Sequence, residues 1–256
     1  MPKFAVILPA AGKSARFGDK EKKPFVNLDG RAVWLRSAEI FVTRDDVCQT
    51  LLVISPDDQE MFERRFRANI VFMNVQTVLG GAERFDSVAN ALAKLKPEAE
   101  FVAIHDAVRP CLTNELIDAV FAAAAAGGGA VLATQVNDTI KRTDAQRKIT
   151  ATVPREGLWL AQTPQVFRRD WLVEAYGRRG ELKEPPTDDA QLVEAAGHRV
   201  QVVPGSSNNI KITNKADLIL AEAILKCRPD PKPKGPIHPF AEDEMWGGRP
   251  KPKKQL

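Results

Sequence analysis

Residues 4–25 read FAVILPAAGKSARFGDKEKKPF, in which an apolar run passes through a proline into a turn of small residues and then into a charged loop. The run Phe4–Leu8 is apolar on both faces, as in a strand that helices cover on both sides of a sheet. It therefore predicts a buried strand that leads into a polar loop. Further apolar runs predict strands at Leu51–Ile54, Ile70–Val75, Phe101–Ile104 and Ala130–Ala133.

Amphipathic stretches of helical length lie between these runs, so that the two kinds of segment alternate along the chain. An alternating β/α order is typical of the α/β fold class and predicts a doubly wound, mostly parallel sheet of Rossmann-like type. Three glycines, residues 127–129, follow the last helix of this part and predict its end. The helices are expected at Ala32–Val42, Gln59–Arg67, Arg84–Leu95 and Asn114–Ala126.

The pattern changes after Gln135. Residues 138–155, DTIKRTDAQRKITATVPR, hold two short alternating segments around a charged turn, which predicts a β-arm inserted at about residues 136–160. We predict one domain over residues 1–227 and a Pro/Lys-rich tail, residues 228–256, that is disordered. The elements expected after the arm are helices at Asp170–Tyr176, Asp188–Ala196 and Lys215–Leu225 and strands at Arg199–Val203 and Ile210–Ile212.

The composition excludes several classes of protein. The chain has 256 residues and a net charge of +4, but residues 228–256 hold 7 Lys and Arg against 4 Asp and Glu. The body is therefore nearly neutral, and a nucleic-acid partner is not expected. No apolar run approaches the roughly 20 residues that cross a bilayer, so no membrane association is expected. The three widely spaced cysteines exclude a disulfide framework and favour a reducing cytoplasm, with Cys111 as a packed thiol.

The turn after the first strand carries the first candidate site. In open α/β sheets, ligands bind at the carboxyl ends of the strands. A small-residue turn at residues 10–12, followed by Arg16, Lys22 and Lys23, combines free backbone N–H groups with cations, as a polyphosphate site requires. Its spacing fits neither a Walker A loop nor G-x-G-x-x-G. The alternative is an ordinary strand-to-helix turn with solvated cations.

A second candidate, IHDAVRP at residues 104–110, follows another expected strand. Asp106 is a natural Mg²⁺ ligand there, because Mg²⁺ takes one or two carboxylates and completes its octahedron with phosphate oxygens and water. Arg109 is close enough to help hold an anion. The alternative is that Asp106 caps the following turn.

A third candidate is GGAERFDS at residues 80–87. Its glycine pair permits close backbone approach, and the Ser87 hydroxyl lies near a helix start, which suits contacts to a base or a ribose. Asp86 or Ser87 would equally serve as a helix cap. The histidines are scattered and predict no metal cluster, with His198 in a structural role. They are His105, His198 and His238.

Together these segments resemble the 2-C-methyl-D-erythritol 4-phosphate cytidylyltransferase family of the non-mevalonate isoprenoid pathway. The resemblance runs from about Phe4 to Leu225 in the family's order and spacing, and the tail lies outside it. The matching segments are PAAGKSARFG, GGAERFDSV, IHDAVRP, NDTIK, REGLWLAQTPQVF, TDDA and NNIKIT.

The resemblance implies a nucleotidyltransferase fold and Mg²⁺-dependent cytidylyl transfer. CTP is the co-substrate, 2-C-methyl-D-erythritol 4-phosphate is the acceptor, and 4-CDP-2-C-methyl-D-erythritol and pyrophosphate are the products. The implied catalytic residues are Arg16, Lys23, Arg155 and Lys211, with Asp106 as the metal ligand. The implied CTP-binding residues are Ala10, Ala11, Gly12, Gly81, Ala82, Ser87, Asp106 and Ala107. The implied acceptor pocket consists of Arg109, Thr139, Arg155, Thr163 and Lys211.

The resemblance also implies a homodimer. In the family the arm, here about residues 137–157, embraces a second subunit, so that Arg155 acts across the interface. Two features of this sequence depart from the family's pattern. Where relatives usually read Pro-Lys-Gln-Phe, this chain reads KKPF, which leaves Lys22 as a rival to Lys23. Where relatives often carry an acid near the metal, this chain has Asn208.

Two other functions compete with this one. Ribitol-5-phosphate cytidylyltransferases share the HDAVRP and QTPQ patterns, but AAG at residues 10–12, Leu158-Trp159 and TDDA at residues 187–190 favour the isoprenoid substrate. A nucleotide-binding module without turnover is a different class of hypothesis. The presence of Arg16, Lys23 and Asp106 argues against it.

Overall fold

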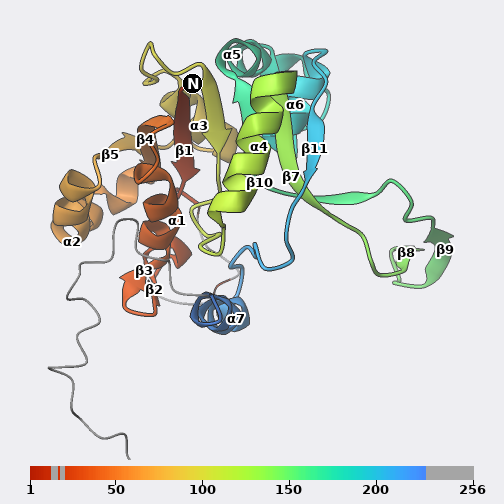
Figure 1. Ribbon diagram of the computed structural model, residues 1–256. Helices are drawn as coiled ribbons and strands as arrows, with labels where there is room; N and C mark the ends of the chain where they lie inside the picture. Colours follow the sequence, from red (N-terminus) through yellow and green to blue (C-terminus); the bar gives the residue numbers. More distant parts are fainter. Residues whose placement is uncertain (13–16, 18–20, 229–256) are drawn as a thin grey trace, which may run out of the picture.

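The fold is seen in a computed structural model, which describes residues 1–12, 17 and 21–228 (Figure 1). Its centre is a seven-stranded sheet with the order β11-β7-β10-β6-β1-β4-β5. All neighbours are parallel except β10, which runs antiparallel to β6 and to β7. The expected mostly parallel α/β sheet is therefore confirmed. The strands are β1 (Phe4–Pro9), β4 (Val47–Ile54), β5 (Val75–Leu79), β6 (Phe101–Ile104), β7 (Gly129–Gln135), β10 (Trp159–Arg168) and β11 (Gln201–Pro204).

Helices cover both faces of the sheet, and β1 shows why its sequence is apolar throughout. Val6 and Leu8 pack into one core cluster and Ala5 and Ile7 into the other. The first cluster holds the helices α1 (Val33–Val42), α2 (Gln59–Phe72) and α4 (Asn114–Gly127). The second holds α3 (Arg84–Leu92), α5 (Arg169–Gly177) and α6 (Asp189–Ala195).

The end of α4 is set by its glycines, as the sequence predicts. Gly128 caps the helix in the left-handed region, with φ of 87°. A Cβ atom at this position would lie 2.2 Å from the Trp171 ring, so no larger residue fits. The glycine thus turns the chain directly into β7.

A last helix, α7 (Lys215–Lys226), packs outside the sheet on a small cluster that includes Leu28, Cys111 and Ile212. Among the residues that the structure describes, no helix is long and apolar enough to span a bilayer. Short elements complete this part of the fold: η1 (Lys23–Phe25), η2 (Pro56–Asp58), η3 (Arg179–Glu181), β2 (Asn27–Leu28) and β3 (Arg31–Ala32).

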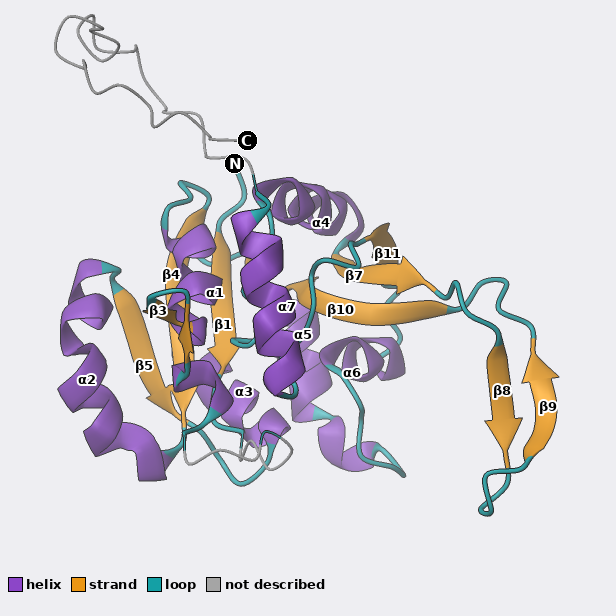
Figure 2. Cartoon of the chain, turned by 90° about the horizontal axis from the view of Figure 1, so that it is seen from below, coloured by secondary structure: helices purple, strands orange, loops and turns teal. Residues whose placement is uncertain are grey.

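The predicted arm is a two-stranded antiparallel ribbon of β8 (Ile140–Thr143) and β9 (Ile149–Val153). It projects from the ends of β7 and β10, away from the helices and the sheet (Figures 1 and 2). Most of its side chains are exposed, and Ile149 retains 65% of its accessible surface. The ribbon therefore buries almost nothing against its own chain.

Three predictions of secondary structure are wrong. The strand expected at Ile70–Val75 begins only at Val75, as β5, because α2 continues to Phe72 and Ile70 extends the helical face of Phe62 and Phe66 against the core. The strand expected at Ile210–Ile212 is an irregular segment in which Ile212 makes a backbone bond to Val108. The central strand β10 was not expected.

The strand β10 was missed because its sequence interrupts the strand pattern. It contains a proline, and its buried side chains include polar ones. The pairing with β7 shifts register between Ala161 and Gln165 to accommodate this segment. The division into a domain of residues 1–227 and a tail stays a prediction, because residues 229–256 lie outside those described.

Candidate active site

Three loops meet at the carboxyl edge of the sheet, because the strands β1, β5 and β6 are parallel and end there. They are the turn after β1, the segment after β5 and the segment after β6. The first two are in close contact: a Cβ atom on Gly80 would lie 2.8 Å from the Ala11 Cβ and 2.7 Å from the Ser87 Oγ. The structure thus brings the small-residue turn and the glycine pair together, as the sequence predicts.

Asp106 lies at the centre of a charged cluster at this edge. Its side chain is 10% exposed. Its Oδ2 lies 3.1 Å from Nε of Arg109 and 3.1 Å from Nζ of Lys211. Arg109 also donates through Nη1 to the backbone oxygen of Asn209, at 2.7 Å. Three predicted site residues are therefore in direct contact, although Lys211 stands 105 positions after Asp106 in the sequence.

The charges around Asp106 keep it ionised. Burial by itself would raise the pKa of this carboxyl, but Lys211, Arg109 and Arg84 outweigh it and lower the pKa to about 2. Asp106 is therefore an anion at neutral pH. With Arg109 and Lys211 against it, the cluster carries one net positive charge and attracts phosphate oxygens.

Thr163 and His105 form the floor beneath Asp106. The Thr163 Oγ1 accepts from the backbone N–H of Asp106 at 3.0 Å and lies 3.1 Å from Nδ1 of His105. The Nε2 of His105 faces the Arg109 carbonyl at 3.1 Å and must donate to it. The imidazole therefore carries its proton on Nε2 and accepts from Thr163 at Nδ1. Burial lowers the pKa of His105 to about 4, which keeps the ring neutral.

The glycine segment after β5 is tied to the start of α3. The Gly81 N–H donates to the Ser87 Oγ, and this hydroxyl donates to the Glu83 carbonyl, both at 3.1 Å. Glu83 is the N-cap and Asp86 completes a capping box, so of the two caps that the sequence offered, Asp86 takes part and Ser87 does not. A Cβ on Gly81 would lie 2.3 Å from the Asp86 Cβ, so this position requires glycine.

The two rival lysines lie in different surroundings. The Lys22 ammonium pairs with the Asp58 carboxylate at 2.8 Å. Lys23 begins the short helix η1, next to the buried Pro24 and Phe25. Arg16, the predicted partner of Lys23, lies outside the described residues.

A resident Mg²⁺ fits the donors at this edge only with help from a substrate. In residues 1–12, 17 and 21–228, no group of three or more His, Cys, Asp or Glu side chains comes together. Asp106 is a single carboxylate, and both of its cations contact Oδ2. One carboxylate is enough for Mg²⁺ when phosphate oxygens and water fill the other positions. The chemistry of the donors therefore suits a metal that arrives with a nucleotide.

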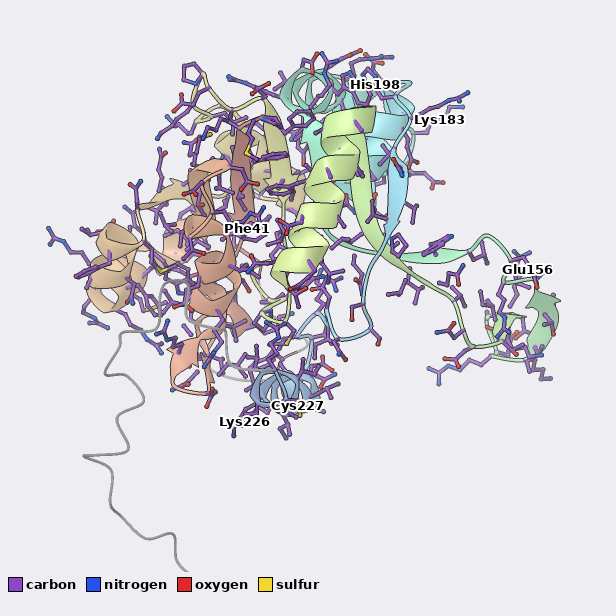
Figure 3. The ribbon with its side chains drawn as sticks, viewed as in Figure 1. Phe41, Glu156, Lys183, His198, Lys226 and Cys227 are labelled. Atoms are coloured by element: carbon purple, nitrogen blue, oxygen red, sulfur yellow. The ribbon has the colours of Figure 1, made fainter. Side chains whose placement is uncertain are left out.

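The predicted residues of the arm are not near this cluster within one chain. Thr139 precedes β8, and Arg155 follows β9 and donates to the Asn137 carbonyl. Glu156, the neighbour of Arg155, lies on the arm far from the sheet (Figure 3). The chain thus assembles the sheet residues of the predicted site and leaves Thr139 and Arg155 apart from them.

Behind the cluster lies a group of buried polar residues that individual motifs did not single out. Asp189 at the start of α6 is fully buried and pairs with Arg84 at the start of α3. The only sequence signal was the TDDA segment, which does not show which acid is buried. A contact between residues 105 positions apart is visible only in the folded chain.

This sheet edge combines loops that follow parallel strands, a glycine pair and one buried carboxylate among cations. Such an arrangement suits the phosphates of a nucleotide. The fold and the site thus define an α/β protein of the nucleotide-binding, group-transferring class. The family model of 2-C-methyl-D-erythritol 4-phosphate cytidylyltransferase matches residues 4–227. With a match over most of its length, the chain belongs to this family, whose members are nucleotidyltransferases.

Individual relatives support the same assignment. The chain is 42% identical to 2-C-methyl-D-erythritol 4-phosphate cytidylyltransferase of Rhodopirellula baltica, over 88% of this chain and 96% of that protein. It is 39% identical to the protein of that name from Dechloromonas aromatica, over 89% and 100%. A crystal structure of 4-diphosphocytidyl-2C-methyl-D-erythritol synthase from Anaerococcus prevotii superposes with a TM-score of 0.76 at 29% identity, covering 88% of this chain and 96% of that one.

Proposed function

We propose that this chain transfers the cytidylyl group of CTP to 2-C-methyl-D-erythritol 4-phosphate, giving 4-CDP-2-C-methyl-D-erythritol and pyrophosphate. Membership of the family supports the reaction. The observation that carries it at the level of residues is the contact of Asp106 with Arg109 and Lys211, beside the Gly81–Ser87 segment. This edge holds two anionic ligands close together.

The reaction needs positive charge more than it needs a base. A phosphate oxygen of the acceptor attacks the α-phosphorus of CTP, the bond from this phosphorus to the bridging oxygen breaks, and pyrophosphate leaves with the electron pair. The attacking oxygen is already anionic, so no strong general base is required. Lys23 and Arg16 are the residues proposed to stabilise the charge on the α-phosphate as it passes through five-coordination. His105 is neutral and buried, which is consistent with a structural role.

The proposed CTP site lies between the turn after β1 and the segment after β5. Backbone groups of Ala10, Ala11 and Gly12 bind the phosphates, with Ala107 nearby, because N–H groups at such a turn attract anions. The Gly81–Ala82 backbone and the ordered Ser87 hydroxyl suit the base and ribose. The close contacts of Gly80 and Gly81 support this placement, because a rigid backbone can distinguish one base from another.

We propose Asp106 as the protein ligand of Mg²⁺. Its ionised carboxylate at the carboxyl edge of the sheet supports this role. The metal, when bound, neutralises charge on the triphosphate. Asn208 is exposed and neutral, so a metal here relies on Asp106, phosphate oxygens and water.

The proposed acceptor pocket needs two subunits. Arg109, Thr163 and Lys211 form one side of it, from one chain. Thr139 and Arg155 belong to an arm that lies apart from them, and we propose that the arm reaches the site of a second copy. An isolated two-stranded ribbon is marginally stable in water, so a partner surface would also stabilise the arm.

A pyrophosphate-release assay across the four nucleoside triphosphates and two acceptors tests the proposal. We expect release only with CTP and 2-C-methyl-D-erythritol 4-phosphate. Release with ribitol 5-phosphate in place of this acceptor would establish the competing substrate. Binding of CTP without release with either acceptor would support a nucleotide-binding module instead.

A further inference from the structure

A second buried ion pair lies behind the proposed nucleotide site. The Oδ2 of Asp189 accepts from Nη2 of Arg84 at 2.6 Å. Its Oδ1 accepts from Nη1 of Arg84 at 3.1 Å and from the Tyr176 hydroxyl at 2.5 Å. Asp189 has no exposed surface, so three donors replace the water that it has lost. A carboxylate held by a bidentate arginine and a hydroxyl is fixed in both position and orientation.

The start of α6, which carries Asp189, is itself tied to the sheet. Gln165 of β10 stands opposite Ile104 of β6, two residues before Asp106. Its Nε2 donates to the Asp188 carboxylate and its Oε1 accepts from the Ala190 N–H, both at 2.9 Å. The side chain of Gln165 thus holds the two neighbours of Asp189. The position of Asp189 is set relative to the strand that leads to Asp106.

Arg84, at the other end of the pair, is the first residue of α3 and follows directly on the glycine segment. A second ion pair holds the same first turn of α3, because Asp86 accepts from Nη2 of Arg179 at 2.6 Å. On its inner side the same turn contacts the glycines through Ser87. The segment from Gly80 to Ser87 is therefore held between the β1 turn inside and two ion pairs outside.

We propose that Asp189 is a positioning residue for recognition of the nucleotide base. By holding Arg84, it sets the distance between the Gly80–Ser87 segment and the turn after β1, and this distance decides which base fits between them. Asp189 itself touches neither the nucleotide nor the reacting atoms. The inference rests on the proposed function, because that function places the base of CTP at this segment.

The variant Asp189→Asn tests this role, because it keeps the size of the side chain but sets an amide group against Arg84. We expect the KM for CTP to rise about tenfold and the ratio of kcat/KM for CTP over UTP to fall severalfold. We expect kcat and the KM for the acceptor to change less than about twofold. A merely structural residue would not change base discrimination. Calorimetry of CTP binding gives a second readout, with Kd expected to rise about tenfold.

Two further variants separate positioning from stability. Asp46→Asn breaks a matched pair at the opposite, amino edge of the sheet, where Asp46 accepts from Arg44 at 2.9 and 2.8 Å. It should lower Tm and leave the KM for CTP unchanged. The double variant Arg84→Met/Asp189→Leu replaces the pair by apolar side chains, which often restores stability. It should recover Tm and keep the raised KM.

The result that overturns the inference is a wild-type KM for CTP and a wild-type CTP/UTP ratio in Asp189→Asn. Recovery of both by the apolar double variant would also overturn it. If Asp189→Asn does not fold, Tyr176→Phe serves in its place, because it removes one hydrogen-bond donor to Asp189. We expect it to raise the KM for CTP about threefold, and an unchanged KM would contradict the inference. Wild-type protein that binds CTP but releases no pyrophosphate would contradict the proposed function but not the role of Asp189. That role would still be tested by comparing the Kd for CTP of the wild type with that of Asp189→Asn.

Discussion

The carboxyl edge of the sheet and the β8–β9 arm both carry residues of the proposed site, yet their side chains are held in opposite ways. At the edge, Asp106 and Asp189 are buried and oriented by cations of the same chain. On the arm, the strands expose most of their side chains, and Arg155 contacts a carbonyl of its own ribbon. One chain is therefore enough to order the edge, whereas under our proposal the arm becomes part of a site only against a second subunit.

The largest expected effect concerns stability. Phe41 is fully buried in the core of the body, whereas Ile149 on the arm is 65% exposed (Figure 3 labels Phe41). Phe41→Ala should lower the free energy of unfolding by about 3–5 kcal/mol, because it leaves a cavity. Ile149→Ala should change it by about 0.5 kcal/mol or less in dilute protein but weaken dimer formation. Urea unfolding and sedimentation measure the two quantities, and equal losses of stability would show that the arm packs on its own body.

The next effect concerns turnover at the sheet edge. Lys23→Ala should lower kcat by about a hundredfold or more with a small change in CTP binding, because the proposed contact forms in the transition state. Lys22→Ala is the matched control, since the Lys22 ammonium already pairs with Asp58. Its kcat should stay within about threefold of the wild type. The reverse result in the pyrophosphate assay would assign the catalytic lysine to Lys22.

A third prediction tests whether the arm completes the site of a second copy. Lys23→Ala and Arg155→Ala should each be inactive, but an equal mixture that exchanges subunits should regain roughly a quarter of wild-type activity. Half of the dimers are then mixed, and each mixed dimer has one complete site.

Mixing Lys23→Ala with Lys211→Ala is the matched control for this experiment. Both residues belong to the sheet side of the site, so every site of the mixed dimer lacks one of them. No activity should return. Activity in both mixtures, or a protein that sediments as a monomer, would contradict the assignment of Arg155 to the partner's site.

The smallest expected effect is a difference in reactivity between a buried and an exposed cysteine thiol. Cys111 is buried and Cys227 is exposed (Figure 3 labels Cys227). Burial raises the pKa of the Cys111 thiol to about 11, so the reactive thiolate forms only at more alkaline pH. At pH 8 a disulfide reagent should label Cys227 at once and Cys111 only after unfolding. Equal rates for the two thiols would place Cys111 at the surface.

The sequence predicted most of this fold because its strands and helices follow local patterns. The strand Phe101–Ile104 and the helix starting at Asn114 lie where apolar runs and turn residues place them. The segments after β1, β5 and β6 could be assigned to one site because parallel strands end at one edge. The wrong secondary-structure predictions fall on segments whose residue types reflect tertiary contacts and not the local element. Ile70 packs as part of a helix, and Gln165 in β10 is polar because it binds the start of α6.

The amino-acid sequence by itself determined the class of fold, the edge of the proposed site and the family, since these depend on periodicity and on motifs that are continuous along the chain. Only the tertiary structure decided which charges meet. It brought Lys211 to Asp106, placed Asp189 behind Arg84, and set the arm apart from both. Burial and ion pairing depend on contacts between residues distant in sequence, and no local pattern specifies such contacts.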